Sequence, residues 1–257
     1  MKLLDLTLAS PAENLACDEA LLDWCEDGAG EEILRFWESG EYFVVVGYAN
    51  KVATEVNVAA CEARRVPVLR RCSGGGTVLQ GPGCLNYALV LRIADEGPTG
   101  NISAANQFIM ERNLGAIENL LARGRRREAL YSKAESRKQK VEISICGHTD
   151  LAIAGLKFSG NSQRRRRRFL LFHGTFLLAF DIALVEALLS PPTKQPDYRN
   201  HRSHKGFLTN LSLPAASVKA TLARAWKTTG PLVNFPRGQI EILAREKYAT
   251  HAWSFKF

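Results

Sequence analysis

The segment RRCSGGGTVLQGPGCLNY (70–87) places two arginines and a serine before three consecutive glycines. Glycines let backbone amides approach a ligand closely and permit positive φ angles, so such a loop can form a concave anion site. An ordinary flexible hairpin is the alternative. Arg70 and Arg71 favour anion binding, because guanidinium groups pair bidentately with carboxylate or phosphate. The Walker A and dinucleotide-binding glycine patterns are both absent, so a nucleotide here would be held by another device.

The segment GHTDLAIAGLKFSGNSQ (147–163) contains Lys157 in an otherwise apolar strand, before a Ser-Gly-Asn turn. A lysine in a strand is ordinarily a solvated charge at a sheet edge. Asp150 and the amides of the turn are candidate neighbours of Lys157. A fixed ammonium can stabilise the negative charge that grows during acyl transfer, a role that needs Lys157 protonated and close to an activated carbonyl.

Cys146 stands directly before Gly147-His148, which suggests a cysteine nucleophile with a neighbouring base. Adjacent residues of a strand point to opposite faces, and a free cysteine is commonly a buried structural thiol, so both readings stay open. His173, followed by Gly174 in an apolar strand, is more typical of a hydrogen-bonded core residue than of a catalytic base.

Alternating strands and helices must position these residues. Ser10-Pro11-Ala12-Glu13 is a capping box with proline at the first helical position, which predicts a helix over about 11–26. Strand patterns follow at 33–37, 42–48, 66–71, 84–91, 142–145, 151–154 and 169–178, and helical patterns at 53–65, 108–124, 182–189 and 218–230. The basic stretch 125–140 is predicted to be an exposed loop. The order predicts an α/β or α+β protein with mixed sheets flanked by helices, without a domain break.

Composition sets the broad class. The 257 residues are 46% hydrophobic and 23% charged, which is typical of a globular protein with a packed core. The six cysteines form no CxxC pair, and the N-terminal residues do not resemble a signal peptide, so we expect reduced thiols and a cytoplasmic location. No apolar run approaches the roughly 20 residues that cross a bilayer, so no membrane partner is expected.

The net charge is +8, and Arg164–Arg168 supply five of the positive charges. Such a run attracts nucleic acid, anionic lipid or an acidic protein. No aromatic residue interrupts it, which counts against single-strand nucleic-acid binding. A non-catalytic nucleic-acid-binding or effector-binding protein remains a separate hypothesis, and a steep salt dependence of binding would distinguish it.

Taken together, these segments resemble the lipoate–protein ligase A family, which belongs to the biotin/lipoate ligase and octanoyl transferase group. The segment 70–87 is similar to the family signature RRxSGGGxV, and 147–175 resembles its NDL…GRKxSGxxxR…HHGT run. Further matches are AENLACDEALL (12–22), VVVGYANKVATEVN (44–57), DYRNHRSHKGFLTNL (197–211) and the closing HAWSF. Two residues depart from the pattern: Phe172 replaces the first histidine of HHGT, and Leu156 replaces the arginine of GRK.

The resemblance implies a single catalytic domain over 1–257 with the fold of biotin ligase and class II aminoacyl-tRNA synthetases. It implies that lipoate and MgATP form lipoyl-AMP, which a lysine of an acceptor domain then attacks. The expected ATP and lipoyl-AMP ligands are Arg71, Gly76, Thr77, Val78, Leu79 and Lys157, with Lys157 also catalytic. Supporting positions are Arg70, Ser73, Gly74, Gly75, Asn86, Asp150, Ser159 and His173. No protein metal site is expected. Val44–Val46 and Leu89–Leu91 could line a slot for the acyl chain, and Lys157 and the glycine loop should face one cavity.

The resemblance leaves a second reaction open. An octanoyl or lipoyl transferase moves the acyl group through a cysteine thioester without ATP, and Cys146 lies upstream of Lys157, as the nucleophile does in such transferases. The ATP-dependent ligase is the favoured reading. Because the sequence ends near the end of the family's large domain, adenylation would call on a separate accessory subunit.

The resemblance also implies the protein partner. The acceptor would be an acidic lipoyl domain of a 2-oxoacid dehydrogenase E2 subunit or a glycine-cleavage H-type protein. We expect Arg165, Arg166 and Arg167 to point outward near the cavity mouth and to steer this domain by charge.

Overall fold

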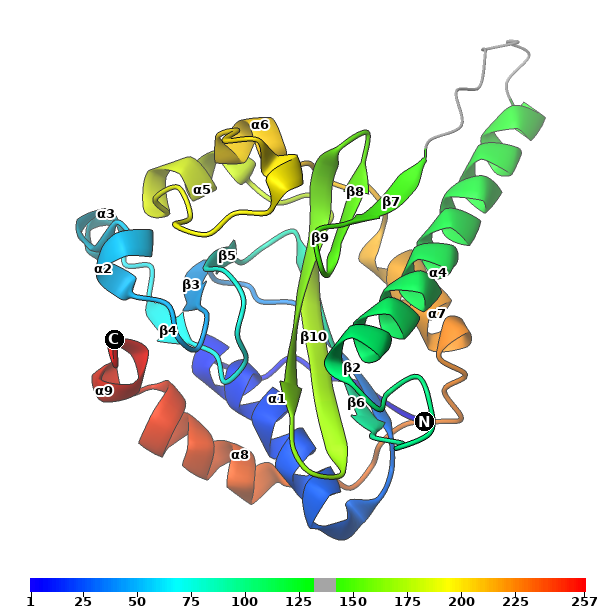
Figure 1. Cartoon of the computed structure of the whole chain (residues 1–257), viewed down its shortest axis with the longest axis horizontal. Helices are drawn as coiled ribbons and strands as arrows, with labels where there is room; N and C mark the ends of the chain where they lie inside the picture. Colours follow the sequence, from blue (N-terminus) through cyan, green and yellow to red (C-terminus); the bar gives the residue numbers. More distant parts are fainter. Residues whose placement is uncertain (132–141) are drawn as a thin grey trace.

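The computed structural model describes residues 1–131 and 142–257 and is built around a large mixed sheet (Figure 1). Its strand order is β1-β2-β6-β10-β9-β8-β7. The strands are β1 (Lys2–Asp5), β2 (Ile33–Trp37), β6 (Cys84–Arg92), β7 (Ile143–Cys146), β8 (Asp150–Ile153), β9 (Leu156–Arg165) and β10 (Phe169–Leu177). β1 and β2 pair in parallel, and the other neighbouring strands pair antiparallel.

A smaller sheet lies beside the large one and carries the glycine loop. Its order is β4 (Val68–Arg70), β3 (Phe43–Val46) and β5 (Val78–Gln80), with β3 parallel to β4 and antiparallel to β5. Short helices cover its outer side: α2 (Val52–Glu55), α3 (Val58–Ala63) and α5 (Ile182–Leu188). The loop between β4 and β5 is therefore held between two sheets.

Helices cover both faces of the large sheet, because its central strands are apolar on both sides. In β2, Ile33 and Trp37 pack toward α1 (Pro11–Trp24), whereas Leu34 and Phe36 pack toward α4 (Ile102–Tyr131) and α7 (Ala215–Ala225). The α1 side is completed by η1 (Cys25–Ala29), α8 (Arg237–Leu243), η3 (Ala244–Tyr248) and α9 (His251–Ser254). Two short segments, η2 (Asp197–Arg199) and α6 (His204–Phe207), lie above the end of β9.

The expected fold class and most expected elements are confirmed. The first helix begins at the predicted capping box, in which the Ser10 amide donates to Glu13 Oε2 at 2.8 Å and the Glu13 amide donates to Ser10 Oγ at 3.2 Å. The strand 33–37 has the predicted bounds. No helix among the described residues is both long and apolar enough to span a membrane.

Several predictions of local structure were wrong. The turn expected at Ser159-Gly160-Asn161 is a continuous part of β9. The helix expected at 53–65 is two helices, α2 and α3, separated by Val56 in extended conformation. Gly124 does not end its helix, because α4 continues to Tyr131 and occupies the start of the expected loop 125–140. The rest of that loop, 132–140, lies outside the described residues. The short C-terminal helices α8 and α9 were not foreseen.

Candidate active site

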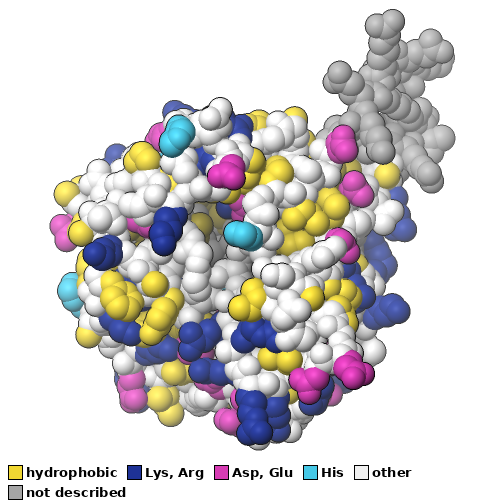
Figure 2. Space-filling view, in the orientation of Figure 1, with side chains coloured by type: hydrophobic (Ala, Val, Ile, Leu, Met, Phe, Trp, Pro, Cys, Tyr) yellow, Lys and Arg dark blue, Asp and Glu magenta, His cyan; other side chains and the backbone are white. Residues whose placement is uncertain are grey.

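A cavity of about 1180 Å³ separates the glycine loop from the β8–β9 end of the large sheet. Figure 2 shows it as a hollow in the middle of the face drawn there. Gly75–Gln80 line one side and Lys157–Ser162, except Phe158, line the other. Its apolar wall is formed by Val45, Leu177, Phe180, Val185, Leu189 and Phe207. A long acyl chain could therefore be buried beside polar groups. Of the expected apolar positions, Val45 contributes to this wall, whereas Leu89–Leu91 pack in the cores.

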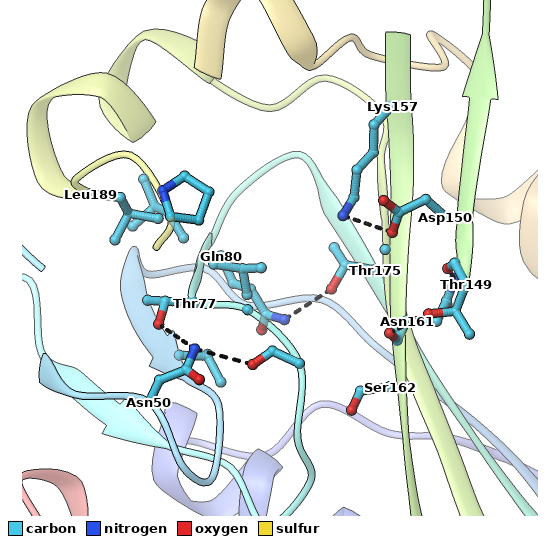
Figure 3. Close-up of a pocket in the computed structure, with 18 of the residues that line it drawn as sticks. Asn50, Thr77, Gln80, Thr149, Asp150, Lys157, Asn161, Ser162, Thr175 and Leu189 are labelled. Carbon is cyan, nitrogen blue, oxygen red and sulfur yellow. Dashed lines mark hydrogen bonds and ion pairs between the residues drawn. The ribbon is translucent and has the colours of Figure 1, made fainter. Parts of the chain in front are cut away.

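Lys157 is held at this cavity by a carboxylate. Its Nζ lies 2.8 Å from Asp150 Oδ1, and the Tyr198 hydroxyl donates to Asp150 Oδ2 at 2.7 Å. Lys157 and Asp150 point toward one another in Figure 3. Burial and the negative charge of Asp150 raise the pKa of Tyr198, so the phenol stays protonated and can donate. Gly160 makes room for the lysine, because a Cβ at this position would lie 2.6 Å from Lys157 Nζ.

Cys146 lies at the edge of the same site, at the end of a row of cross-strand partners. Thr175, Gly160 and Asp150 are paired in register across β10, β9 and β8, and Cys146 is the partner of Asp150 on β7. Directly opposed residues of antiparallel strands point to the same face, with Cβ atoms about 4.5–5.5 Å apart. Thr175, Gly160 and Asp150 all line the cavity, as does Gly147, which follows Cys146. Cys146 itself stands at the rim rather than in the lining.

Cys146 differs from the other cysteines in its environment. It is half-buried, whereas the other five are buried. Burial raises the pKa of Cys17 to about 11 and those of Cys25, Cys72 and Cys84 to about 12. The base suggested by the sequence, His148, is exposed in the β7–β8 turn and forms no hydrogen bond with Cys146 among the described contacts. Ser144 Oγ is the polar atom next to the thiol, 3.3 Å from Cys146 Sγ.

The two arginines before the glycine loop bind the protein itself. Arg71 donates to the carbonyls of Gly74 and Gly76 and, at 3.1 Å, to Ser73 Oγ. Burial lowers the pKa of Arg71 to about 10, so it remains a cation at neutral pH. Arg71 lines the cavity, and its guanidinium shapes the loop.

The supporting role in anion binding expected of Arg70 is wrong. Its side chain is fully buried and donates to five carbonyl groups. They belong to Gly47, Tyr48, Asn50, Trp253 and Ser254. Every guanidinium nitrogen is thereby engaged, and Arg70 joins α9 to the 47–50 loop at the cavity.

A buried polar chain anchors the start of the glycine loop. The ring of His173 lies 2.6 Å from Ser73 Oγ through Nε2 and 2.9 Å from Asp18 Oδ2 through Nδ1. Asp18 also pairs with Arg35 at 2.6 Å. Burial disfavours the carboxylate, but the charge of Arg35 and the hydrogen bond with His173 outweigh it and lower the pKa of Asp18. Ser73 is buried outside the cavity lining, and its hydrogen bond with His173 anchors the start of the loop.

The residues expected to hold MgATP fit it poorly. Thr77 donates its hydroxyl to Glu55 Oε2, and Asn50 Nδ2 donates to the same oxygen at 2.7 Å. Asn50 Nδ2 also lies 3.4 Å from Thr77 Oγ1, as Figure 3 shows. Glu55 is a buried carboxylate in the cavity wall and would repel a phosphate beside Thr77. Arg71 and Lys157 are already engaged by carbonyl groups and by Asp150. No cluster of three or more His, Cys, Asp or Glu side chains among the described residues could hold a metal ion.

The remaining expected residues divide into two groups. The lining contains Gly75, Gly76, Thr77, Val78, Leu79, Asn86, Asp150, Lys157, Ser159 and His173, together with Arg71. Gly74 lies outside it and accepts a hydrogen bond from Ser162 at 2.8 Å. Thus Lys157 and the glycine loop share one cavity. Sequence reasoning missed Asp18, Glu55 and Tyr198 as site residues, although each lies in a segment that carries the family resemblance.

The position expected for Arg165, Arg166 and Arg167 is wrong. Arg165 donates to the carbonyls of Thr99 and Gly100, and Arg166 pairs with Asp23 at 2.7 Å. Arg167 is exposed in the β9–β10 turn, and none of the three lines the cavity. The turn lies at the end of β9 opposite Lys157, as Figure 1 shows.

Comparison with known proteins places this site in a family. A family model described as the lipoyl protein ligase A/B catalytic domain matches residues 10–225. The chain belongs to this family. Among curated relatives, octanoyltransferase LipM of Carboxydothermus hydrogenoformans is 29% identical, over 96% of this chain and 96% of the relative. Octanoyltransferase LipM of Bacillus subtilis is 26% identical, over 99% and 98% respectively.

Solved structures agree with the fold. A bipartite lipoate protein ligase from Thermoplasma acidophilum, described together with its E2 lipoyl domain, has a TM-score of 0.78 at 21% identity, covering 99% of this chain and 95% of that one. Lipoate-protein ligase A bound with ATP has a TM-score of 0.71 at 22% identity, covering 99% and 98%. These likenesses support the mixed α/β fold.

The favoured reading of the sequence, an ATP-dependent ligase, is corrected by these comparisons. The first two curated relatives, which align over nearly the whole chain, are octanoyltransferases at 25% and 29% identity. An enzyme of the lipoyl ligase and transferase family is therefore supported, with the transferase as the better-supported reaction.

Proposed function

We propose that this enzyme transfers an octanoyl group from an acyl thioester to a lysine of a lipoyl acceptor domain through a thioester on Cys146. The observation that carries the proposal is the row across β7, β8 and β9, in which Cys146 is the cross-strand partner of Asp150 and Asp150 holds the ammonium of Lys157. The names of the curated relatives agree with this reaction.

The donor must already be activated, because the reaction uses no ATP. The Cys146 thiolate attacks the carbonyl of the donor thioester, the donor thiolate leaves and takes up a proton, and octanoyl-Cys146 results. The neutral amine of the acceptor lysine then attacks this thioester. The amide forms, the Cys146 thiolate leaves, and the proton lost by the amine passes to solvent or to the thiolate.

Lys157 has a separate role in both steps. Each attack places negative charge on the carbonyl oxygen, and an ammonium held at a fixed position stabilises it. The Asp150 carboxylate orients the amine, while Tyr198 holds Asp150 from the other side. The apolar wall accommodates the acyl chain, whose burial contributes about 0.8 kcal/mol per methylene.

Intact-protein mass spectrometry tests the proposal. The protein is incubated with S-octanoyl pantetheine without ATP, and then with an E2 lipoyl domain. We expect one octanoyl group on the enzyme, lost when the acceptor gains it. Cys146→Ala should abolish both steps, and Lys157→Ala should slow them by about 10²–10³-fold. Cys61→Ala, which removes a buried thiol outside the cavity, is the matched control.

A parallel reaction with free octanoate, ATP and magnesium distinguishes the two chemistries. Octanoylation of the acceptor that requires ATP and survives Cys146→Ala would refute the transferase.

A further inference from the structure

Arg164 is the member of the arginine run that remains without a partner beside the cavity. Among the described residues its side chain forms no hydrogen bond or ion pair, and its Nε is buried without an acceptor. Arg165 and Arg166, by contrast, are engaged. The Arg164 guanidinium lies over the ring of Tyr48, 5.8 Å from the centroid. A buried N–H group without an acceptor is costly, and a bound acceptor such as a carboxylate can satisfy it.

Lys256 is a second cation that contacts the Tyr48 ring. Lys256 Nζ donates to the Tyr48 hydroxyl at 3.1 Å and lies 4.8 Å from the centre of the Tyr48 ring. That hydrogen bond and the positive charge lower the pKa of Tyr48. The rings of Trp253 and Phe257 pack against Tyr48, at centroid distances of 5.8 and 6.0 Å. Lys256, like Arg164, forms no ion pair within the described residues.

These side chains adjoin the mouth of the cavity. Arg164 lies two residues along β9 from Ser162, which lines the cavity, so the two point to the same face about 6–7 Å apart along the strand. Tyr48 directly precedes Ala49 and Asn50, which also line it. Figure 2 shows Lys and Arg side chains below the central hollow, next to a hydrophobic patch on the side of α9. We call Tyr48, Arg164, Trp253, Lys256 and Phe257 the basic–aromatic face.

We propose that the basic–aromatic face docks the acidic acceptor domain and brings its lysine to the cavity; this inference rests on the proposed function. Arginine, tyrosine and tryptophan are the residues enriched at the energetic centres of protein interfaces. The two unpaired cations supply the charge complementary to an acidic domain. The reaction itself requires a macromolecular amine at the mouth, which selects a protein partner for this face rather than a nucleic acid.

Single-turnover transfer from octanoyl-enzyme tests the docking step apart from the first step. Wild type, Arg164→Glu and Lys256→Glu are loaded with S-octanoyl pantetheine, an uncharged donor, and mixed with increasing concentrations of an acidic E2 lipoyl domain. We expect loading to proceed at the wild-type rate. The acceptor concentration at half-maximal rate should rise about tenfold or more, with the rate at saturation within twofold and a weaker salt dependence.

Arg167→Glu is the matched control, because it makes the same charge change in the exposed β9–β10 turn. It should leave the acceptor concentration at half-maximal rate within about twofold of wild type, because salt screens the interaction between charges that are far apart. If Arg164→Glu does not fold, Lys256→Glu carries the test, because Lys256 is exposed.

Two results would overturn the proposal: equal weakening by all three substitutions, or an acceptor dependence that Arg164→Glu and Lys256→Glu leave unchanged, with or without slower loading from the donor. Slower loading would then assign the face to the donor. Calorimetric titration of the lipoyl domain into unacylated wild type and variants measures docking directly. Failure of Cys146 to become acylated would therefore refute the proposed function without deciding the docking face.

Discussion

Gly160 offers a perturbation that should leave the fold intact and damage the reaction. In Gly160→Ala, the added Cβ would stand 2.6 Å from both Cε and Nζ of Lys157. Ordinary contacts need about 3.5 Å, so the tip of the lysine must retreat by about 1 Å. Because that tip is the end of a flexible chain and Gly160 lies in a strand without a positive φ, the backbone has no reason to change.

The retreat breaks the geometry on which catalysis depends. Lys157 Nζ lies 2.8 Å from Asp150 Oδ1, and moving it by about 1 Å carries it beyond hydrogen-bond distance. A misplacement of about 1 Å in a catalytic group can cost about 10²-fold in rate. We therefore expect Gly160→Ala to slow both formation of octanoyl-Cys146 and its transfer by about 10²-fold, with the melting temperature almost unchanged.

Rapid-quench mass spectrometry of the two steps, with thermal unfolding of the same samples, measures this effect. Gly238→Ala, in α8 and with no atom within 4 Å of the added Cβ, is the control. A Gly160→Ala variant that loads and transfers at the wild-type rate would show that the position of the ammonium does not matter, and would refute the role given to Lys157.

Three further predictions concern Arg70, Asp18 and Cys146. Arg70→Ala leaves its carbonyl partners unpaired and should lower the free energy of unfolding by about 3 kcal/mol or more, a fall in Tm of roughly 6–12 °C by calorimetry. Asp18→Asn breaks the buried pair with Arg35 and should cost about 3–5 kcal/mol. Since the folded pKa of Asp18 is lowered, that deficit should be complete above about pH 4 and shrink as pH falls further, in urea unfolding. Brief iodoacetamide treatment of the folded protein should label Cys146 alone, and mass mapping of another labelled cysteine would contradict its distinct environment.

The sequence predicted the parts of the site that depend on local pattern. Three consecutive glycines between strands indicate a loop, and an apolar strand that contains Lys157 indicates a charged group held at a sheet. The order of these segments indicated the family. In the structure they share a cavity, since β5 and β9 lie on its two sides.

The partners of charged side chains could not be predicted in this way, because they come from distant parts of the chain. Arg70 and Arg71 are neighbours with the same chemistry, but Arg70 binds carbonyls 183–184 residues away while Arg71 binds the loop beside it. The five adjacent arginines look alike in sequence. Strand alternation separates Arg164 from Arg165, and acids of α1 engage Arg166.

The sequence motifs could not distinguish a ligase from a transferase, and the reason is chemical. Both reactions place an acyl carbonyl beside an ammonium and a glycine loop, so the motifs that identify the family serve a step that the two reactions share. What differs is how the acyl group becomes activated. A ligase needs a site that tolerates phosphates, whereas a transferase needs a thiol. In this chain the buried carboxylate of Glu55 accepts a hydrogen bond from Thr77, one of the residues expected to bind the nucleotide, and Cys146 is the cross-strand partner of Asp150. Neither residue belongs to the glycine or lysine motif. Their positions at the site, which bear on the choice between the two reactions, therefore became known only from the fold.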